Sequence, residues 1–400
     1  MKSVTSTLVG LLTLVSLAFP ATDSLLCRLV GHCDVPGPCV GVAVSGHIAC
    51  VALAESTMCV LDVSDTVNPV VVGRYVHAMS YVSAVDMDDD YAYLADNYGL
   101  RVIDVRDPAN PTQVGVYHSP CALIGVTKVG KYAYVCAWTS GLRIVDVSNP
   151  VLPVEVGHCD TDSARTVVID GNYAYLADQG EMRVIDISDP ANPFNVGRWP
   201  SHYYAEGVDV FSHYAIVADG TTQRIIDVSD PTNPNQVGCF DQWGYAYCVE
   251  VVGEYAYVAE HGGLRVIDIA DPTNPLEVGH YYDTTSVHIS WWVEKVGKYL
   301  YTVDYLHGLQ VVEFYGEEVG VEEGRRPPAC SSQLTAALVR GVLFLPDDRR
   351  PKTGDRAALL DAAGRRVMEL QPGPNDVQHL GPGVYFISSP GSVEKVILTR

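Results

Sequence analysis

Residues 99–117 read GLRVIDVRDPANPTQVGVY, and this stretch decides the fold because the chain repeats it. It recurs as GLRIVDVSNPVLPVEVGHC (141–159), EMRVIDISDPANPFNVGRW (181–199), TQRIIDVSDPTNPNQVGCF (222–240) and GLRVIDIADPTNPLEVGHY (263–281), with a looser first copy, MCVLDVSDTVNPVVVGRY (58–75). The aspartates that end the apolar run lie 40–42 residues apart and are Asp62, Asp104, Asp146, Asp186, Asp227 and Asp268. A degenerate last copy puts Glu313 at this place.

Each copy belongs to a larger unit of four strand-like segments. A second apolar segment precedes the aspartate, as in DYAYLAD (90–96) and GEYAYVAE (253–260), and the VGxY segment follows it. A shorter first segment surrounds a recurring valine: Val42, Val85, Val126, Val167, Val208, Val249 and Val293. Four short strands with turn signals between them, at this period, are the pattern of a β-propeller blade.

The first and last parts of the repeat array complement each other. The second segment occurs seven times, but the last unit stops after its third strand, at LQVVEFYG (309–316). Residues 27–33, CRLVGHC, match the missing VGxY strand. We therefore predict an all-β fold: a seven-bladed β-propeller closed by an N-terminal strand, which avoids the two exposed sheet edges of an open ring.

The repeat also resembles a known family. Units of the form LRVIDVSDPxNPxxVG are similar to the LVIVD repeat of bacterial and archaeal surface proteins, and the resemblance covers about residues 27–316. It implies a propeller that is secreted or held at the surface of a bacterium. Tryptophan-aspartate, kelch and sialidase-type signatures are absent from the sequence.

The composition changes after the repeats. We predict a propeller over 22–316, a linker rich in Glu, Arg and Pro over 317–340, and a small β-sandwich over 341–400. The segments LLDAAGRRV (359–367), LGPGVYFI (380–387) and EKVILTR (394–400) resemble the C-terminal sorting domain of the type IX secretion system. That resemblance implies a partnership with the secretion machinery, although the family's opening Asn-Pro element is missing. An ordinary β domain is the alternative.

The first residues predict export. Lys2 precedes an apolar run over residues 8–19, and the small residues Ala18 and Ala21 follow the pattern of a signal peptide over 1–21. The run is too short to cross a membrane and no later segment is longer, so we expect no transmembrane segment. A net charge of −22 argues against nucleic acid as a partner, because the phosphates would repel the protein.

The repeated aspartates suggest structure rather than catalysis. Catalytic groups are expected once, with asymmetric neighbours, whereas this aspartate recurs six times. Its carboxylate can accept backbone N–H groups of the following turn, which the Asp-Pro and Asn-Pro pairs then shape. An arginine three residues before the aspartate lies on the opposite side of the sheet and predicts ion pairs between neighbouring blades. These arginines are Arg101, Arg143, Arg183, Arg224 and Arg265.

One face of the ring has variable loops. These join the second strand to the third and the fourth to the next unit's first, and we call this side the loop-rich face; the opposite side, with its uniform turns, is the turn face. The residue eight before the second strand's aromatic is expected at the channel mouth, and four such residues are Arg165, Glu206, Tyr247 and Trp291. We predict a ligand-binding face from these and Trp243, Tyr204, Tyr245 and His288. A simple ion pair between Arg165 and Glu206 is the alternative.

No cofactor is predicted. The histidines form no metal-binding motif, and no nucleophile or nucleotide motif is present. Calcium remains open because of the acidic charge, but DMDDD (86–90) lacks the glycine and distal glutamate of a calcium loop. The eleven cysteines are odd in number and lack a C-x-x-C motif, and Cys50, Cys136 and Cys248 are expected as small buried hydrophobes.

Three functions follow from these observations. The first is a non-enzymatic scaffold that binds protein or glycan at the cell surface, since aromatic side chains at a propeller mouth can stack on sugars or hold a peptide. The second is an enzyme acting on polysaccharide or peptide near Arg165, Glu206 and His288. The third is a structural component of a surface coat.

Overall fold

The computed structural model describes residues 22–55, 57–77, 80–241, 244–283 and 289–315, and the strands between residues 337 and 398. All of its named elements are strands. In this described part, no helix has the length and apolar character needed to cross a membrane. The chain divides into two compact units, residues 1–320 and residues 321–400.

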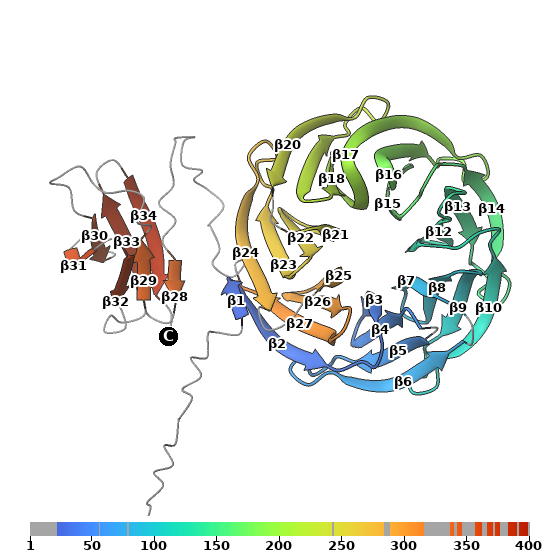
Figure 1. The fold of residues 1–400 in the computed structure, drawn as a ribbon, viewed down its shortest axis with the longest axis horizontal. Helices are drawn as coiled ribbons and strands as arrows, with labels where there is room; N and C mark the ends of the chain where they lie inside the picture. Colours follow the sequence, from blue (N-terminus) through green and yellow to red (C-terminus); the bar gives the residue numbers. More distant parts are fainter. Residues whose placement is uncertain are drawn as a thin grey trace, which may run out of the picture. The chain divides into compact units, whose positions relative to one another are not determined.

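The first unit is a ring of antiparallel sheets (Figure 1). Three four-stranded sheets come first: β3 (Cys39–Ser45), β4 (Ile48–Leu53), β5 (Thr57–Asp62) and β6 (Val70–Val76); β7 (Val82–Met87), β8 (Tyr91–Asp96), β9 (Gly99–Asp104) and β10 (Thr112–His118); β11 (Gly125–Val129), β12 (Tyr132–Cys136), β13 (Leu142–Asp146) and β14 (Val154–Cys159). A six-stranded sheet follows: β15 (Thr166–Asp170), β16 (Tyr173–Asp186), β17 (Phe194–Phe211), β18 (Tyr214–Asp219), β19 (Thr222–Asp227) and β20 (Asn235–Asp241). The ring ends with β21 (Ala246–Val252), β22 (Tyr255–Glu260), β23 (Gly263–Asp268) and β24 (Leu276–Asp283), and with β25 (Ser290–Val296), β26 (Tyr299–Asp304) and β27 (Gly308–Phe314).

The propeller architecture is confirmed, but the prediction of seven separate blades is wrong: the ring consists of six sheets. The fourth and fifth repeat units share the six-stranded sheet because β16 and β17 continue through the segments predicted as loops. Gln179 of β16 pairs with Ala205 of β17, and this pair joins the two units.

The N-terminal strand closes the ring as predicted. β2 (Cys27–Cys33) pairs antiparallel with β27, with Cys27 opposite Phe314 and Cys33 opposite Leu309. β1 (Thr22–Leu25) adds a further strand to the outer edge of β24 (Figure 1). The closing strand therefore joins two segments that are far apart in the chain: His32 and His307, which are in contact, are separated by 275 residues.

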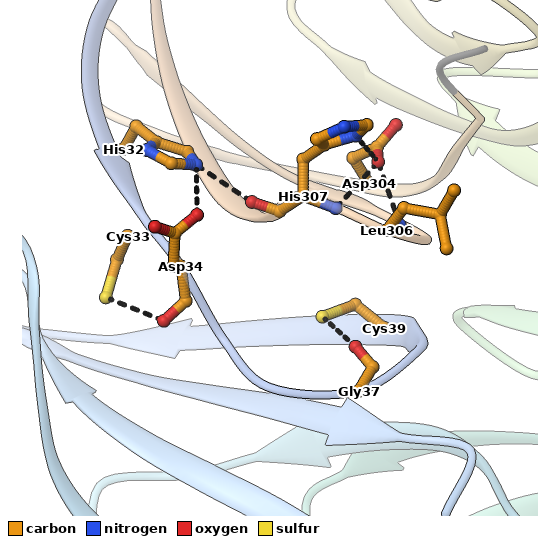
Figure 2. A network of polar contacts seen from close by, with 8 residues as sticks. All are labelled: His32, Cys33, Asp34, Gly37, Cys39, Asp304, Leu306 and His307. Carbon is orange, nitrogen blue, oxygen red and sulfur yellow. Dashed lines mark hydrogen bonds and ion pairs between the residues drawn. The ribbon is translucent and has the colours of Figure 1, made fainter. Parts of the chain in front are cut away.

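Polar contacts fasten this junction on the loop-rich face (Figure 2). His32 Nε2 lies 2.9 Å from the carbonyl oxygen of His307 and 3.3 Å from Asp34 Oδ1. The buried carboxylate of Asp304 accepts the backbone N–H groups of Leu306 and His307 at 2.9 Å and lies 2.6 Å from His307 Nδ1. These contacts fix the last loop against the incoming N-terminal strand.

The core lies between neighbouring sheets. The second and third strands of each unit are nearly continuous apolar runs because sheets cover them on both sides, as the buried β8 and β9 show. One core cluster joins Val303 and Val311 of the last unit to Val51 and Leu61 of the first. The apolar core therefore extends across the point of closure.

Each repeated turn packs on a glycine of the preceding unit. A Cβ atom added to Gly115 would lie 2.0 Å from the carbonyl oxygen of Pro150, and one added to Gly73 would lie equally close to that of Pro108. A β-bulge immediately precedes Gly115. The VG and Asp-Pro motifs are thus two sides of one contact between neighbouring units.

The repeated aspartates have the hydrogen bonds of Asx-type caps. Asp104 Oδ1 accepts the backbone N–H of Arg106 at 3.1 Å, and Asp107 Oδ1 accepts that of Ala109 at 3.2 Å. Equivalent bonds to the residue two positions on are made by Asp62, Asp146, Asp186, Asp227 and Asp268. The turn face is therefore held by short local contacts.

The predicted arginine ion pairs between blades are wrong, because the arginines pair within their own unit. Arg101 binds Asp96 at the end of the preceding strand and Gln113 of the following strand, the latter at 3.0 Å. Arg265 likewise binds Glu260 and Glu277. Beside Arg101, a tyrosine of the preceding unit makes a contact that does cross the boundary: Tyr75 donates to Gln113 Oε1 at 2.7 Å.

The second unit contains two small sheets. One has β28 (Ala337–Val339), β29 (Val342–Leu345) and β32 (Gly373–Asp376), and the other has β30 (Ala357–Asp361), β31 (Arg366–Leu370), β33 (Gly383–Ser389) and β34 (Ser392–Leu398). The β-sandwich stays a prediction, as does its resemblance to a sorting domain. The signal peptide over 1–21 and the linker up to residue 336 lie outside the described residues.

Candidate functional site

The residues predicted at the channel mouth lie at the start of the innermost strands β15, β21 and β25 and, for Glu206, within the long strand β17. Glu206, Tyr247 and Trp291 each occupy a register shift, where β17, β21 and β25 carry one residue more than the strand they pair with. Such β-bulges redirect a side chain and often lie beside functional sites. Arg165 immediately precedes β15, and its backbone N–H donates to the carbonyl oxygen of Ala177 at 2.9 Å.

The structure joins these residues from one unit to the next. Arg165 Nη1 donates to Glu206 Oε2 across neighbouring units, so the predicted ion pair exists. Tyr245 donates its hydroxyl hydrogen to Glu206 Oε1 at 2.9 Å. Burial and the Glu206 charge raise the pKa of Tyr245 well above its ordinary value, so its hydroxyl remains a donor.

Aromatic rings continue the row. The rings of Tyr247 and Trp291 are tilted toward each other with their centroids 4.6 Å apart. The ring of Tyr245 lies 5.3 Å from that of Tyr247, and the ring of Tyr305 lies 6.1 Å from that of Trp291. The indole Nε1 of Trp291 and the Nε of Arg165 are buried atoms that have no hydrogen-bond acceptor among the described residues. We call Arg165, Glu206, Tyr245, Tyr247 and Trp291 the mouth cluster; it combines an ion pair with packed aromatic rings.

Exposed aromatic side chains surround this cluster on the loop-rich face. Tyr203 and Tyr204 are 61% and 51% exposed, and Tyr81, Tyr98 and Trp138 also lie on its loops with about half of their surface exposed. Aromatic side chains in contact with solvent are typical of interaction surfaces. Trp243 and His288, which we also predicted for this face, lie outside the described residues.

Buried acids support these loops, and we did not predict them. Asp219 is fully buried at the end of β18 and accepts hydrogen bonds from Ser201 Oγ at 2.6 Å and from the backbone N–H of Tyr203 at 2.9 Å, besides pairing with Arg224. The same strand position holds Asp96, Asp178, Glu260 and Asp304. The sequence could have indicated these buried acids, because an acidic residue recurs at the same position of the second strand.

Two clusters of acidic residues are candidates for a metal site. Asp162, Asp178 and Glu181 lie close enough together to hold a cation, but Arg183 forms ion pairs with all three and already supplies the positive charge. In the second cluster, the acidic segment 86–90, Asp88 caps its own turn by accepting the backbone N–H groups of Asp90 and Tyr91. Both groups therefore have a local structural role.

The ten described cysteines are unpaired thiols. Cys50, Cys136 and Cys248 are buried within the sheets, as predicted for small hydrophobic residues. Burial raises the pKa of Cys50 to about 12, so its thiol stays protonated and unreactive at neutral pH.

Comparisons with known proteins agree with this architecture. Three solved structures resemble the chain, and each covers 72% of it: the computationally designed Ika8 protein (TM-score 0.54, 10% identity, 99% of that chain), a chain of the mitotic checkpoint complex (0.61, 12%, 96%) and the Pan2 WD40 domain of Neurospora crassa (0.58, 12%, 95%). At this identity the likeness shows the fold alone. No curated protein matches the sequence.

The repeat itself matches a family model described as the LVIVD repeat. The matched segments are residues 36–77, 81–119, 125–161, 163–199, 204–242 and 243–284. They follow the strand units of the ring one after another, from β3 to β24. Because these segments together make up more than half of the sequence, the chain belongs to the LVIVD-repeat family.

Proposed function

We propose that this protein is an exported, non-enzymatic scaffold that binds a protein or glycan ligand with the loop-rich face of its propeller. The observation that carries the proposal is the mouth cluster, in which four successive repeat units place an ion pair and stacked rings side by side. The turn face, by contrast, repeats one local arrangement. Binding residues usually lie on variable loops held by a rigid scaffold.

The chemistry of the mouth cluster favours binding over catalysis. Both oxygens of Glu206 are occupied, one by Arg165 and the other by Tyr245, so this carboxylate is held as an acceptor. The rings of Tyr247 and Trp291 provide apolar area with little conformational freedom to lose.

We also propose where the scaffold acts. The signal-like residues 1–21 and the sorting-domain resemblance of residues 341–400 support export and attachment at a bacterial surface. In this proposal the secretion machinery is a second partner, through the C-terminal residues. The acidic charge of the chain keeps it soluble outside the cell.

A glycan and peptide array probed with the full chain tests the proposal. We expect binding to a defined subset of array members. Tyr247→Ala should weaken this binding at least tenfold, since hot-spot aromatic residues contribute about 2 kcal/mol or more. The control is Phe194→Ala, an exposed aromatic residue of the turn face, which should bind like the wild type. An array without binding, or equal loss in both variants, would contradict the proposal.

A further inference from the structure

Four carboxylates line the central channel, and the proposed binding function does not use them. Asp86, Asp209, Glu250 and Glu294 lie on the innermost strands β7, β17, β21 and β25. Together with a ring of valines they border a cavity of about 160 Å³. Three of them follow Glu206, Tyr247 and Trp291 by three residues on the same strands.

Each carboxylate joins its own strand to the next repeat unit. The innermost strands are sheet edges, so their outer N–H groups need partners from elsewhere. Asp86 accepts the backbone N–H of Lys128, Asp209 that of Val251 and Glu250 that of Lys295, each at 2.6 Å. Glu294 accepts that of Val44, and this bond connects the last unit to the first.

The carboxylates also face one another. Glu250 is within electrostatic reach of Asp209 and Glu294, and Glu294 is within reach of Asp86. The nearby cations are Lys128 and Lys295, and the nearby acid outside the group is Asp88, whose carboxylate binds the Lys128 ammonium at 3.0 Å.

Tyr93 is a further titratable group within electrostatic reach of Asp86, and burial raises its pKa. The Lys295 ammonium lies over the ring of Tyr257, 5.3 Å from its centroid. Cys248 also faces the group, but burial keeps its thiol protonated. In the other three units the equivalent position holds Ala43, Thr127 or Val168, which do not titrate.

We propose that these four carboxylates are a pH-sensitive clasp: in the protonated form they hold the innermost strands together, and as they ionise their mutual repulsion loosens the ring. A protonated carboxyl group retains an oxygen that accepts the neighbouring N–H. Ionisation keeps that acceptor but places like charges around a narrow cavity, where water screens them poorly.

The direction of the pH effect follows from proton linkage. Burial first, and then the neighbouring acids, raise the pKa of Glu250 to about 8, and burial raises that of Asp209 to about 6. The pKa values of Asp86 and Glu294 are raised for the same reasons. The clasp's contribution to stability is therefore complete below the ordinary carboxyl pKa and is lost as pH rises through these elevated values.

Thermal unfolding of the full chain between pH 5 and pH 9 tests the clasp. Each group that is protonated in the folded chain but ionised in the unfolded one raises the unfolding constant about tenfold per pH unit. We expect the wild type to lose stability across this range, and the E250Q/E294Q double variant to lose less, because glutamine keeps the acceptor without the charge. Glu254→Gln, an exposed acid of the adjacent turn, is the matched control and should follow the wild type. Parallel profiles for the wild type and the double variant would overturn the proposal.

A second measurement needs no variant and stays decisive if the double variant does not fold. Unfolding of the wild-type chain by urea at pH 7, in weakly buffered solution, should release protons, because carboxyl groups whose pKa is raised in the folded chain ionise on unfolding. A net proton uptake, or no release, would overturn the proposal.

Discussion

We compare two sets of repeated carboxylates. Removing them has different effects on stability, because one set caps turns at the surface and the other is buried. Asp104 lies at the surface and caps a turn, so its loss removes local hydrogen bonds. Asp96 and Asp219 are completely buried beside an arginine that is largely shielded from solvent, so the loss of either leaves that arginine without its carboxylate partner. The penalty for removing a group depends on what it leaves behind.

Asp219→Ala should lower the free energy of unfolding by about 3–5 kcal/mol, because it strips a buried partner from Arg224 and frees the loop that carries Tyr203. Chemical denaturation followed by circular dichroism measures this change. Asp170→Ala, an exposed aspartate of the preceding unit, should change stability by less than about 0.5 kcal/mol. Similar losses in the two variants would contradict the role assigned to Asp219.

The predictability of single residues depends on whether they repeat. The turn aspartates could be interpreted from sequence because six copies share one context. The channel carboxylates could not, because Asp86, Glu250 and Glu294 alternate around the ring with Thr127 and Val168. Their common role appears only when neighbouring innermost strands are placed side by side.

At the scale of elements, the fit between the VG strand and the neighbouring turn sets the period of the chain. The prolines present a carbonyl group to the preceding unit's glycine, and no space remains there for a side chain. The two most conspicuous repeated motifs of the sequence therefore act across the boundary between units. The loop-rich face can vary in sequence because these contacts lie on the turn face.

Gly115→Ala should destabilise the protein by about 1–3 kcal/mol, since the new methyl group would collide with the backbone at Pro150 and force the two units apart. The control is Gly180→Ala, because a methyl group there would have no neighbour within 4 Å. Thermal unfolding of the two variants in one buffer compares them directly. If both variants keep the wild-type melting temperature, the packing argument fails.

Predictions of strands were correct where the local sequence pattern determines the structure. Predictions were wrong where tertiary contacts determine it. Strand positions and the closing strand follow from alternating apolar segments and from the match of residues 27–33 to the VGxY segment. The fused sheet does not, because the segment around Gln179 and Gly180 reads as a loop until it pairs with Ala205. The arginines were assigned to the wrong neighbour because sequence spacing gives their side of the sheet but not their partner.

At the scale of the whole molecule, repetition and variation are divided between the two faces of one ring. Local turn contacts and the glycine fit hold every unit in the same way, and an apolar core continues across the point where the N-terminal strand closes the circle. Against this uniform background the loop-rich face carries the mouth cluster and most of the exposed aromatic residues. A rigid scaffold with one variable face suits recognition of a partner.

Hydrogen exchange of the full chain, with and without the tightest-binding member of the array, tests this division most directly. We expect the ligand to slow exchange in residues 203–206, 245–247 and 289–293, which belong to the loop-rich face, and to leave the turns over 106–111 and 188–193 unchanged. Slower exchange in the turns, with no change in the three loop segments, would contradict it.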